Sequence, residues 1–510
     1  MHVNLRVLGK KKQGLAFLAL QLVLVGLMYP FMEYGPDALP KPPRNRSHPA
    51  LSTNTGDATY ARTIPNDGPN PFYPTYQDVH VMVFVGFGFL MAFLKRYGQS
   101  SLGLTFLLGG FFTQLALFAE GFAAIASDNT NGTAKISLSL ESFFAADTAV
   151  AAVLISFGAV IGKTSFFQLI VMGTVEIAAY TLNRHLCLRV LKAIDTGGSI
   201  VVHLFGAYFG LAASYASYGR TRSTNSKRKV RRLDSSYNSD IFAMIGTLVL
   251  WLYWPSFNSA GLSRDLQTRA IINTMISMCT SCVLSFACSL LLSDNDKFLM
   301  THVQNASLAG GVAIGTVTGL MIGPFEAALV GSLGGIVSVL GYHGLQPYLT
   351  RRCKITDTCG VHNVHGLPSW IAAFYSAGLA YTASISDYSY SLYELFPARA
   401  PSPGHELDLV NAAHLLDIPA GESRSAGSQA LHQMASLALT FAMSITSGLF
   451  AGALMRIPFF GSVPDDQLYE DSVIFDLPSG AEDPDIDTSR IKEDRRESSL
   501  ENSAVQSTRF

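Results

Sequence analysis

Long apolar runs alternate with short polar connections along most of the chain. A helix of about 20 residues crosses the roughly 30 Å hydrocarbon core of a bilayer, so each run of that length predicts a membrane-spanning helix. Twelve runs qualify, at residues 15–34, 78–95, 101–124, 138–161, 165–186, 196–217, 239–257, 268–293, 299–322, 326–346, 359–384 and 431–455. The pattern predicts an all-α polytopic membrane protein with about twelve transmembrane helices, which form one membrane domain over residues 1–456.

Basic residues in alternate connections predict the orientation of these helices. Lys10, Lys11 and Lys12 precede the first run, which is too long for the apolar core of a signal peptide and has no small-residue cleavage site before Tyr34. Further basic residues fall on the same predicted side, at Lys95 with Arg96, Lys163, seven positions between Arg220 and Arg232, Arg351 with Arg352 and Lys354, and Arg456. Because cytoplasmic loops are enriched in Lys and Arg, we expect an uncleaved first helix and cytosolic N- and C-termini. Arg184, Arg189 and Lys192 are an exception, since they fall on the outer side.

Glycosylation sequons agree with this orientation. Asn45-Arg46-Ser47 and Asn131-Gly132-Thr133 both lie in predicted outer loops, so Asn45 and Asn131 are candidate glycosylation sites. A third sequon, at Asn305, lies in an apolar run and should stay unmodified. The sequons favour a eukaryotic surface protein, with the plasma membrane as its expected location.

Two polar segments lie between or beyond the predicted helices. An outer loop covers residues 385–430, and a tail covers residues 457–510 with thirteen acidic and five basic residues. We expect the tail to be largely disordered and cytosolic. It is a solvated tail or a docking segment for cytosolic partners.

Composition narrows the function class. Only 14% of the residues are charged, against about a quarter in soluble proteins, and the net charge is −1. A chain without excess positive charge is not expected to bind nucleic acid. The six cysteines lie mostly in apolar runs, and the C-x-x-C formed by Cys279 and Cys282 has no second pair, so packing residues are expected rather than disulfides or metal ligands.

One short sequence occurs twice. Residues 195–203 and residues 357–365 both read D-T-x-G-x-x-x-x-H. The first copy opens the sixth predicted helix from outside and the second opens the eleventh from the cytosol, so the copies have opposite orientation. Inverted repeats of this kind place a transport path between two halves of a membrane protein.

The repeat predicts a meeting of two histidines. Eight helical residues rise about 12 Å, so His203 and His365 should approach each other near the membrane midplane from opposite sides. Ionisable groups at that depth are costly and usually functional. Asp195 and Asp357 suit helix capping, attraction of cations or proton relay, and these roles are compatible. His362 is either part of the inner mouth of the path or an ordinary polar contact.

The chain resembles the Rh glycoproteins of the ammonium transporter/Rh family from the first helix to about residue 478. The stretches that carry the resemblance are residues 157–163 (FGAVIGK), 195–199 (DTGGS), 203–211 (HLFGAYFGL), 240–247 (DIFAMIGT), 254–260 (WPSFNSA), 304–312 (QNASLAGGV), 357–360 (DTCG), 365–368 (HGLP) and 469–471 (YED). The resemblance implies the ammonium transporter/Rh fold and a homotrimer with one pore in each subunit. It also implies that His203 and His365 are the twin histidines of the pore and that Phe257 is one of two phenylalanines that close its outer side.

The family conducts ammonia, and carbon dioxide is a second candidate. Ammonium carries a charge that apolar surroundings exclude, whereas a neutral amine costs only a few kcal/mol to transfer, so an apolar tube selects NH3 after the proton is shed. Two neutral imidazoles can share one N–H and offer their remaining nitrogens to a passing molecule. No cofactor is implied.

The sequence departs from the family pattern near the outer mouth. Thr148 stands where the second gate phenylalanine is usual, while Phe143 and Phe144 are nearby but out of register. Arg184 replaces the acid of a usual Asn-Glu pair, and Ser369 replaces a glycine. An outer positive charge would repel ammonium, so recruitment and gating are expected to differ.

Two other function classes are compatible with parts of the sequence. A non-conducting structural partner is the main alternative, since some family members are described in this role, but both pore histidines are present here. An intramembrane metalloenzyme would need ligands beyond His203, His362 and His365, and neither helix offers an acid or a cysteine at ligand spacing. The sequence therefore favours a channel or facilitator for NH3 and not an enzyme.

Overall fold

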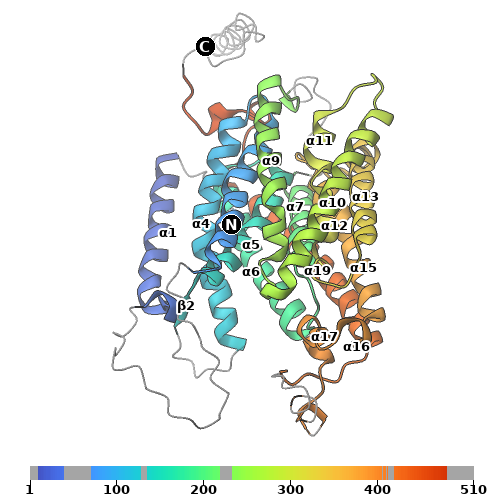
Figure 1. Cartoon of the computed structure of the whole chain (residues 1–510). Helices are drawn as coiled ribbons and strands as arrows, with labels where there is room; N and C mark the ends of the chain where they lie inside the picture. Colours follow the sequence, from blue (N-terminus) through green and yellow to red (C-terminus); the bar gives the residue numbers. More distant parts are fainter. Residues whose placement is uncertain are drawn as a thin grey trace, which may run out of the picture.

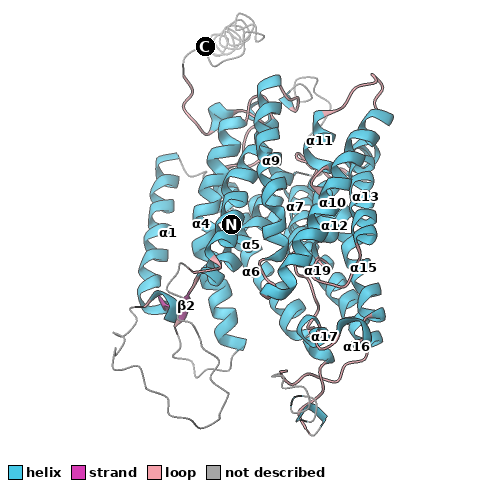
Figure 2. Cartoon of the chain, viewed as in Figure 1, coloured by secondary structure: helices cyan, strands magenta, loops and turns pink. Residues whose placement is uncertain are grey.

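The computed structural model describes residues 10–39, 70–127, 135–218, 232–404, 406–408, 411 and 418–478. The sequons at Asn45 and Asn131 and most of the basic segment before Arg232 lie outside the described residues. The described chain is a bundle of helices (Figures 1 and 2). One end of the bundle carries the C-terminal segment and is called the tail end. The opposite end, with the strands and the helices α16 and α17, is called the loop end (Figure 1).

Long helices form most of the described chain. They are α1 (Lys10–Phe31), α4 (Gly98–Ser127), α5 (Leu140–Val160), α6 (Phe166–Arg184), α7 (Phe205–Tyr218), α9 (Tyr237–Ser259), α10 (Arg264–Leu291), α13 (Pro324–Leu340), α15 (Leu367–Thr382) and α19 (Ala426–Met455). Shorter helices are α2 (Tyr73–Val81), α3 (Phe87–Leu90), α11 (Met300–Ala306), α12 (Ala309–Gly315), α14 (Gln346–Tyr348), α16 (Ile385–Tyr388) and α17 (Ser391–Leu395). Wider π-helical turns join several of them, namely η2 (Met82–Gly86), η4 (His185–Val190), η5 (Ser199–Leu204), η6 (Gly341–Leu345), η7 (Leu349–Cys353) and η8 (His362–Gly366).

Every predicted apolar run coincides with helix, so the all-α membrane fold is confirmed. Ten helices, counted within the described residues, are long and apolar enough to cross a membrane. The run at 299–322 is divided between α11 and α12, and the run at 359–384 begins with η8 before α15. The number of twelve spans therefore stays a prediction.

Serine caps begin several of the helices. The Ser139, Ser165 and Ser236 hydroxyls accept hydrogen bonds from the backbone N–H three residues further on, at the starts of α5, α6 and α9. Each cap satisfies a donor that the first helical turn leaves free. The polar residues between apolar runs thus determine where these helices start.

The centre of the bundle is formed by α5 and by η5 with α7. Of the residues in the membrane-spanning stretch of each, 78% and 83% are buried. The corresponding share for α1 is 6%, so α1 lies at the periphery. Glycines allow the central helices to approach closely, because a Cβ atom on Gly448 of α19 would clash with the Phe209 carbonyl oxygen of α7. Small residues at crossings are the usual basis of helix packing in membranes.

A two-stranded parallel sheet lies at the loop end. Strand β1 (Met32–Tyr34) pairs with β2 (Ile136–Leu138), with Met32 opposite Ile136. The pairing joins the end of α1 to the segment that precedes α5 (Figure 1).

The C-terminal segment packs against the tail end. Glu470 forms ion pairs with Arg96 at 2.8 Å and Arg232 at 3.0 Å. The Asp471 carboxylate accepts hydrogen bonds from the backbone N–H groups of Gln99 and Ser100 at the start of α4. Residues 479–510 lie outside the described part, so the division at residue 457 and the disorder of the tail stay predictions.

Candidate functional site

Two histidine side chains meet inside the bundle. Nδ1 of His203 lies 3.1 Å from Nδ1 of His365, and the planes of the two rings are nearly parallel, with 10° between them. Both residues are buried. In this contact one Nδ1 must carry the hydrogen and the other must accept it, so the two imidazoles share a single N–H between them.

Each histidine lies in a π-helical turn that opens a helix. His203 belongs to η5 before α7, and His365 belongs to η8 before α15. Such turns are rare and often mark functional sites. The glycine that both repeat copies share is explained by the backbone, because Gly198 and Gly360 have φ values of 67° and 76°, a left-handed conformation that favours glycine.

The two aspartates of the repeat cap these turns. Asp195 Oδ2 accepts from the backbone N–H groups of Ile200 and Val201, and its Oδ1 accepts from the Thr316 hydroxyl at 2.6 Å. The Asp357 carboxylate accepts three backbone N–H bonds, from residues 360, 361 and 362. The capping role is therefore present in both copies, and it leaves little free acceptor capacity on either carboxylate.

Aromatic rings surround the histidine pair. The His203 ring stacks on Trp254 with centroids 5.6 Å apart, and Phe257 lies 5.7 Å away. The His365 ring stacks at 6.4 Å on Phe87, from the segment after α2. The histidines therefore have apolar walls on both sides.

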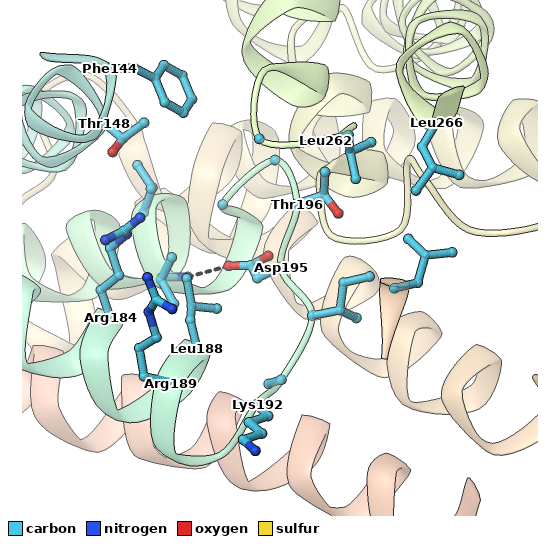
Figure 3. A pocket seen from close by; sticks show the side chains of 18 of the residues that line it. Phe144, Thr148, Arg184, Leu188, Arg189, Lys192, Asp195, Thr196, Leu262 and Leu266 are labelled. Atoms are coloured by element: carbon cyan, nitrogen blue, oxygen red, sulfur yellow. Dashed lines mark hydrogen bonds between the residues drawn. The ribbon is translucent and has the colours of Figure 1, made fainter. Parts of the chain in front are cut away.

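A cavity of about 540 Å³ opens at the loop end and is called the vestibule. Its lining includes Phe257, Phe144 and Thr148, together with Val201 and Val202 from η5. Figure 3 shows Phe144 and Thr148 on one wall of the vestibule. Phe144, which is out of register in the sequence, thus places a ring in the same cavity as Phe257.

Basic residues line the same vestibule. Arg184, Arg189 and Lys192 lie on one side of it (Figure 3). Arg184 Nη1 donates to Glu120 Oε2 at 2.6 Å, and Lys192 Nζ lies 2.8 Å from Glu422 Oε1. Hydrogen bonds from Lys192 and Arg424 lower the pKa of Glu422. Two of the three cations that the sequence places on the outer side therefore have acidic partners.

Towards the tail end, a small cavity of about 30 Å³ contacts His365 and is lined mainly by apolar side chains. His362 is buried, with its ring 5.6 Å from Tyr208, whose hydroxyl accepts from Trp370 Nε1. His362 Nδ1 and His203 Nε2 have no hydrogen-bond partner among the described residues.

Ser369 stands where the family usually has a glycine. Its hydroxyl donates to the His365 carbonyl oxygen at 2.6 Å, a hydrogen bond that a glycine could not make.

Four residues at the site carry no motif that predicts a role there, namely Trp254, Tyr208, Glu120 and Glu422. Glu120 carried a usable signal, since an acid inside an apolar run is costly and needs a partner. Within the described residues, no group of three His, Cys, Asp or Glu side chains could hold a metal ion.

Comparisons with known proteins agree with this architecture. The model of the Ammonium Transporter Family matches residues 62–461. "Ammonium transporter Rh type B" of Xenopus tropicalis is 42% identical over 409 residues, which cover 80% of this chain and 83% of that protein. "Ammonium transporter Rh type C" of Sus scrofa is 38% identical over 484 residues, which cover 92% and 96%. The solved structure of Nitrosomonas europaea Rh50, described as a Rhesus-family channel, matches with a TM-score of 0.63 and 30% identity, covering 85% of this chain and 98% of that one. The resemblance inferred from the motifs is confirmed, and the chain belongs to the ammonium transporter family, whose members are transporters rather than enzymes.

Proposed function

We propose that this protein conducts ammonia along a path that runs from the vestibule, past His203 and His365, to the small cavity near the tail end. The observation that carries the proposal is the hydrogen bond between the two Nδ1 atoms. It supports a neutral pair that spans the apolar part of the path. The path takes NH3, and the proton of ammonium stays behind at the vestibule.

Because the two Nδ1 atoms share one hydrogen, the Nε2 atoms of the two rings differ in protonation. In the ring that donates through Nδ1, a neutral imidazole keeps a lone pair on Nε2, and in the accepting ring Nε2 carries the hydrogen. One end of the pair therefore offers an acceptor to NH3 and the other offers a donor. The free Nε2 of His203 among the described residues supports this arrangement. Each contact replaces one hydrogen bond to water, so the molecule passes without a strong trap.

The walls of the path support selection against the charged form. Trp254, Phe257 and Phe87 surround the histidines, and the small cavity is lined by apolar groups such as Leu154 and Val364. An ammonium ion would lose its hydration there without a carboxylate to replace it, which costs far more than transfer of neutral NH3.

The same proposal includes the orientation of the protein in the membrane. The loop end is extracellular and the tail end cytosolic, because the basic residues Lys11, Arg96 and Arg232 lie towards the tail end and agree with the positive-inside rule.

We place the protein in the plasma membrane as a homotrimer, in line with its family, with one path in each subunit. Carbon dioxide is a second neutral molecule that an apolar path accepts. The tail beyond residue 478 is the segment available to cytosolic partners.

The test is a stopped-flow measurement of internal pH in proteoliposomes under an ammonium gradient. Wild-type protein should give rapid alkalinisation, and His203→Ala and His365→Ala should both lose it. His302→Ala is the matched control, because His302 is also buried but bonds Ser289 away from the pair, and it should conduct normally. Wild-type flux equal to that of empty liposomes would contradict the proposal and favour a structural partner without conduction.

A further inference from the structure

One buried acid has no role in the path described above. Glu176 lies in the middle of α6 and is fully buried. Among the described residues no Lys, Arg or His forms an ion pair with it, and its Oε2 atom has no hydrogen-bond partner. A carboxylate in such surroundings would be an uncompensated charge at membrane depth, which is among the most expensive arrangements in a membrane protein.

Among the described residues Glu176 has one side-chain hydrogen-bond contact, and that contact constrains where its hydrogen lies. Glu176 Oε1 lies 2.5 Å from Ser156 Oγ, and Ser156 Oγ lies 2.7 Å from the Gly206 carbonyl oxygen. A serine hydroxyl has one hydrogen, and a carbonyl oxygen can only accept. If Ser156 donates to Gly206, the hydrogen in the 2.5 Å contact has to come from Glu176. The separation is in the range of O–H···O bonds.

We propose that Glu176 is a neutral carboxylic acid in the resting protein and that its proton, donated to Ser156, positions the start of α7, directly after the turn that carries His203. The bonds form a chain from α6 through Ser156 of α5 to Gly206 of α7. Gly206 lies three residues after His203, about one helical turn away.

The surrounding packing explains why this chain affects position. A Cβ atom on Gly206 would lie 2.7 Å from the Ala152 carbonyl oxygen, so α5 and α7 are already in backbone contact. One turn along α6, Tyr180 packs edge-on against Phe205 with centroids 5.9 Å apart, and its hydroxyl lies 3.5 Å from Thr148 Oγ1. α6 therefore holds α5 and α7 together at two successive levels, and of these two contacts the one at Glu176 uses a carboxylic acid.

The first measurement is infrared spectroscopy of the protein in lipid at neutral pH. The difference between wild type and Glu176→Gln should show loss of the carbonyl stretch of a protonated carboxylic acid. Glu326→Gln is the matched control, because Glu326 is exposed at the start of α13, and it should show loss of a carboxylate band instead. Loss of a carboxylate band in Glu176→Gln would overturn the proposal, whether or not the protein conducts.

The second measurement is ammonium-driven flux, and this part rests on the proposed function. Glu176→Gln should conduct like the wild type, because an amide N–H replaces the acid O–H. Glu176→Ala and Ser156→Ala should each lower the flux about tenfold, since a small misplacement of a reacting group costs one to two orders of magnitude, and the double variant should lose no more than either single one. Equal loss in Glu176→Gln and Glu176→Ala, with both proteins folded, would overturn the positioning role. If the wild type did not conduct, the proposed function would fail, and the infrared result alone would decide the state of Glu176.

Discussion

Arg184 and Glu120 form an ion pair at the rim of the vestibule, with 2.6 Å between Nη1 and Oε2. Glu120 Oε1 also accepts from the Thr181 hydroxyl, so one carboxylate from α4 holds two side chains of α6. The positive charge at position 184 therefore has its counter-charge in the same structure. Ammonium that approaches the vestibule meets a nearly neutral pair rather than a free guanidinium group.

Removal of that counter-charge should weaken ammonium recruitment. In Glu120→Gln the charge of Arg184 is no longer balanced, and we expect a severalfold rise in the ammonium concentration that gives half-maximal flux, with maximal flux unchanged. Added salt should reduce the difference, because ions screen exposed charges over about 8–10 Å. Stopped-flow titration at two salt concentrations measures both effects. Glu141→Gln is the control, since Glu141 is exposed, lines a second cavity that Arg184 also lines, and forms no ion pair with Arg184 among the described residues. An equal effect in Glu141→Gln would mean that the loss of any acid in this region weakens recruitment, and not the loss of the partner of Arg184.

The cap formed by Asp195 should contribute measurably to stability. Asp195→Ala removes three hydrogen bonds and should lower the free energy of unfolding by about 2 kcal/mol, the upper end of the effect of lost helix caps. Asp195→Asn keeps one accepting oxygen and should lose about half as much. Thermal unfolding in detergent measures this, with Asp265→Ala as control because the first turn of α10 shows no side-chain cap bond. If Asp195→Asn abolished flux without any loss of stability, proton relay would be its main role instead.

The rings in the vestibule should control which amines pass. Phe257→Ala widens the vestibule next to His203, and we expect the ratio of methylamine flux to ammonia flux to rise severalfold. Thr148→Phe adds a ring to the lining of the cavity that Phe144 and Phe257 share, and it should lower the same ratio. Paired flux assays with the two amines test both directions. A ratio that stays constant in both variants would show that these side chains do not form the narrow part of the path.

Acid should weaken the attachment of the outer loop through Glu422. The salt links with Lys192 and Arg424 lower the pKa of this glutamate in the folded protein, so its contribution to stability is present above the ordinary pKa of glutamate and is lost as the pH falls through the lower, folded value. Wild type should therefore unfold at a higher temperature than Glu422→Gln at neutral pH, and the two should converge in strong acid. The effect should be small because the side chains of Glu422 and Lys192 are partly exposed. Curves that remain parallel down to strong acid would contradict this assignment.

Several features of this protein follow from the sequence alone. Apolar runs of about 20 residues determine the membrane helices. Inside a bilayer every backbone N–H and C=O needs a partner within the protein, and apart from closed β-barrels only helices provide one for each group. The repeated D-T-x-G-x-x-x-x-H brings His203 and His365 to one level because helix rise converts sequence spacing into depth. Cap residues such as Ser139 and Ser165 mark helix starts for the same local reason.

Other features were decided only by the tertiary structure. Arg184 meets Glu120 across 64 positions, and Lys192 meets Glu422 across a still longer separation. Phe144 lines the vestibule because of how α5 is rotated about its axis, and Glu176 reaches Ser156 because α5, α6 and α7 meet at one level. Helices that are apolar on all sides carry no periodic signal for the face that each turns inward. Rotation and neighbour choice are therefore determined by close packing of small residues and by pairing of the few buried polar groups, which exist only once the helices have assembled.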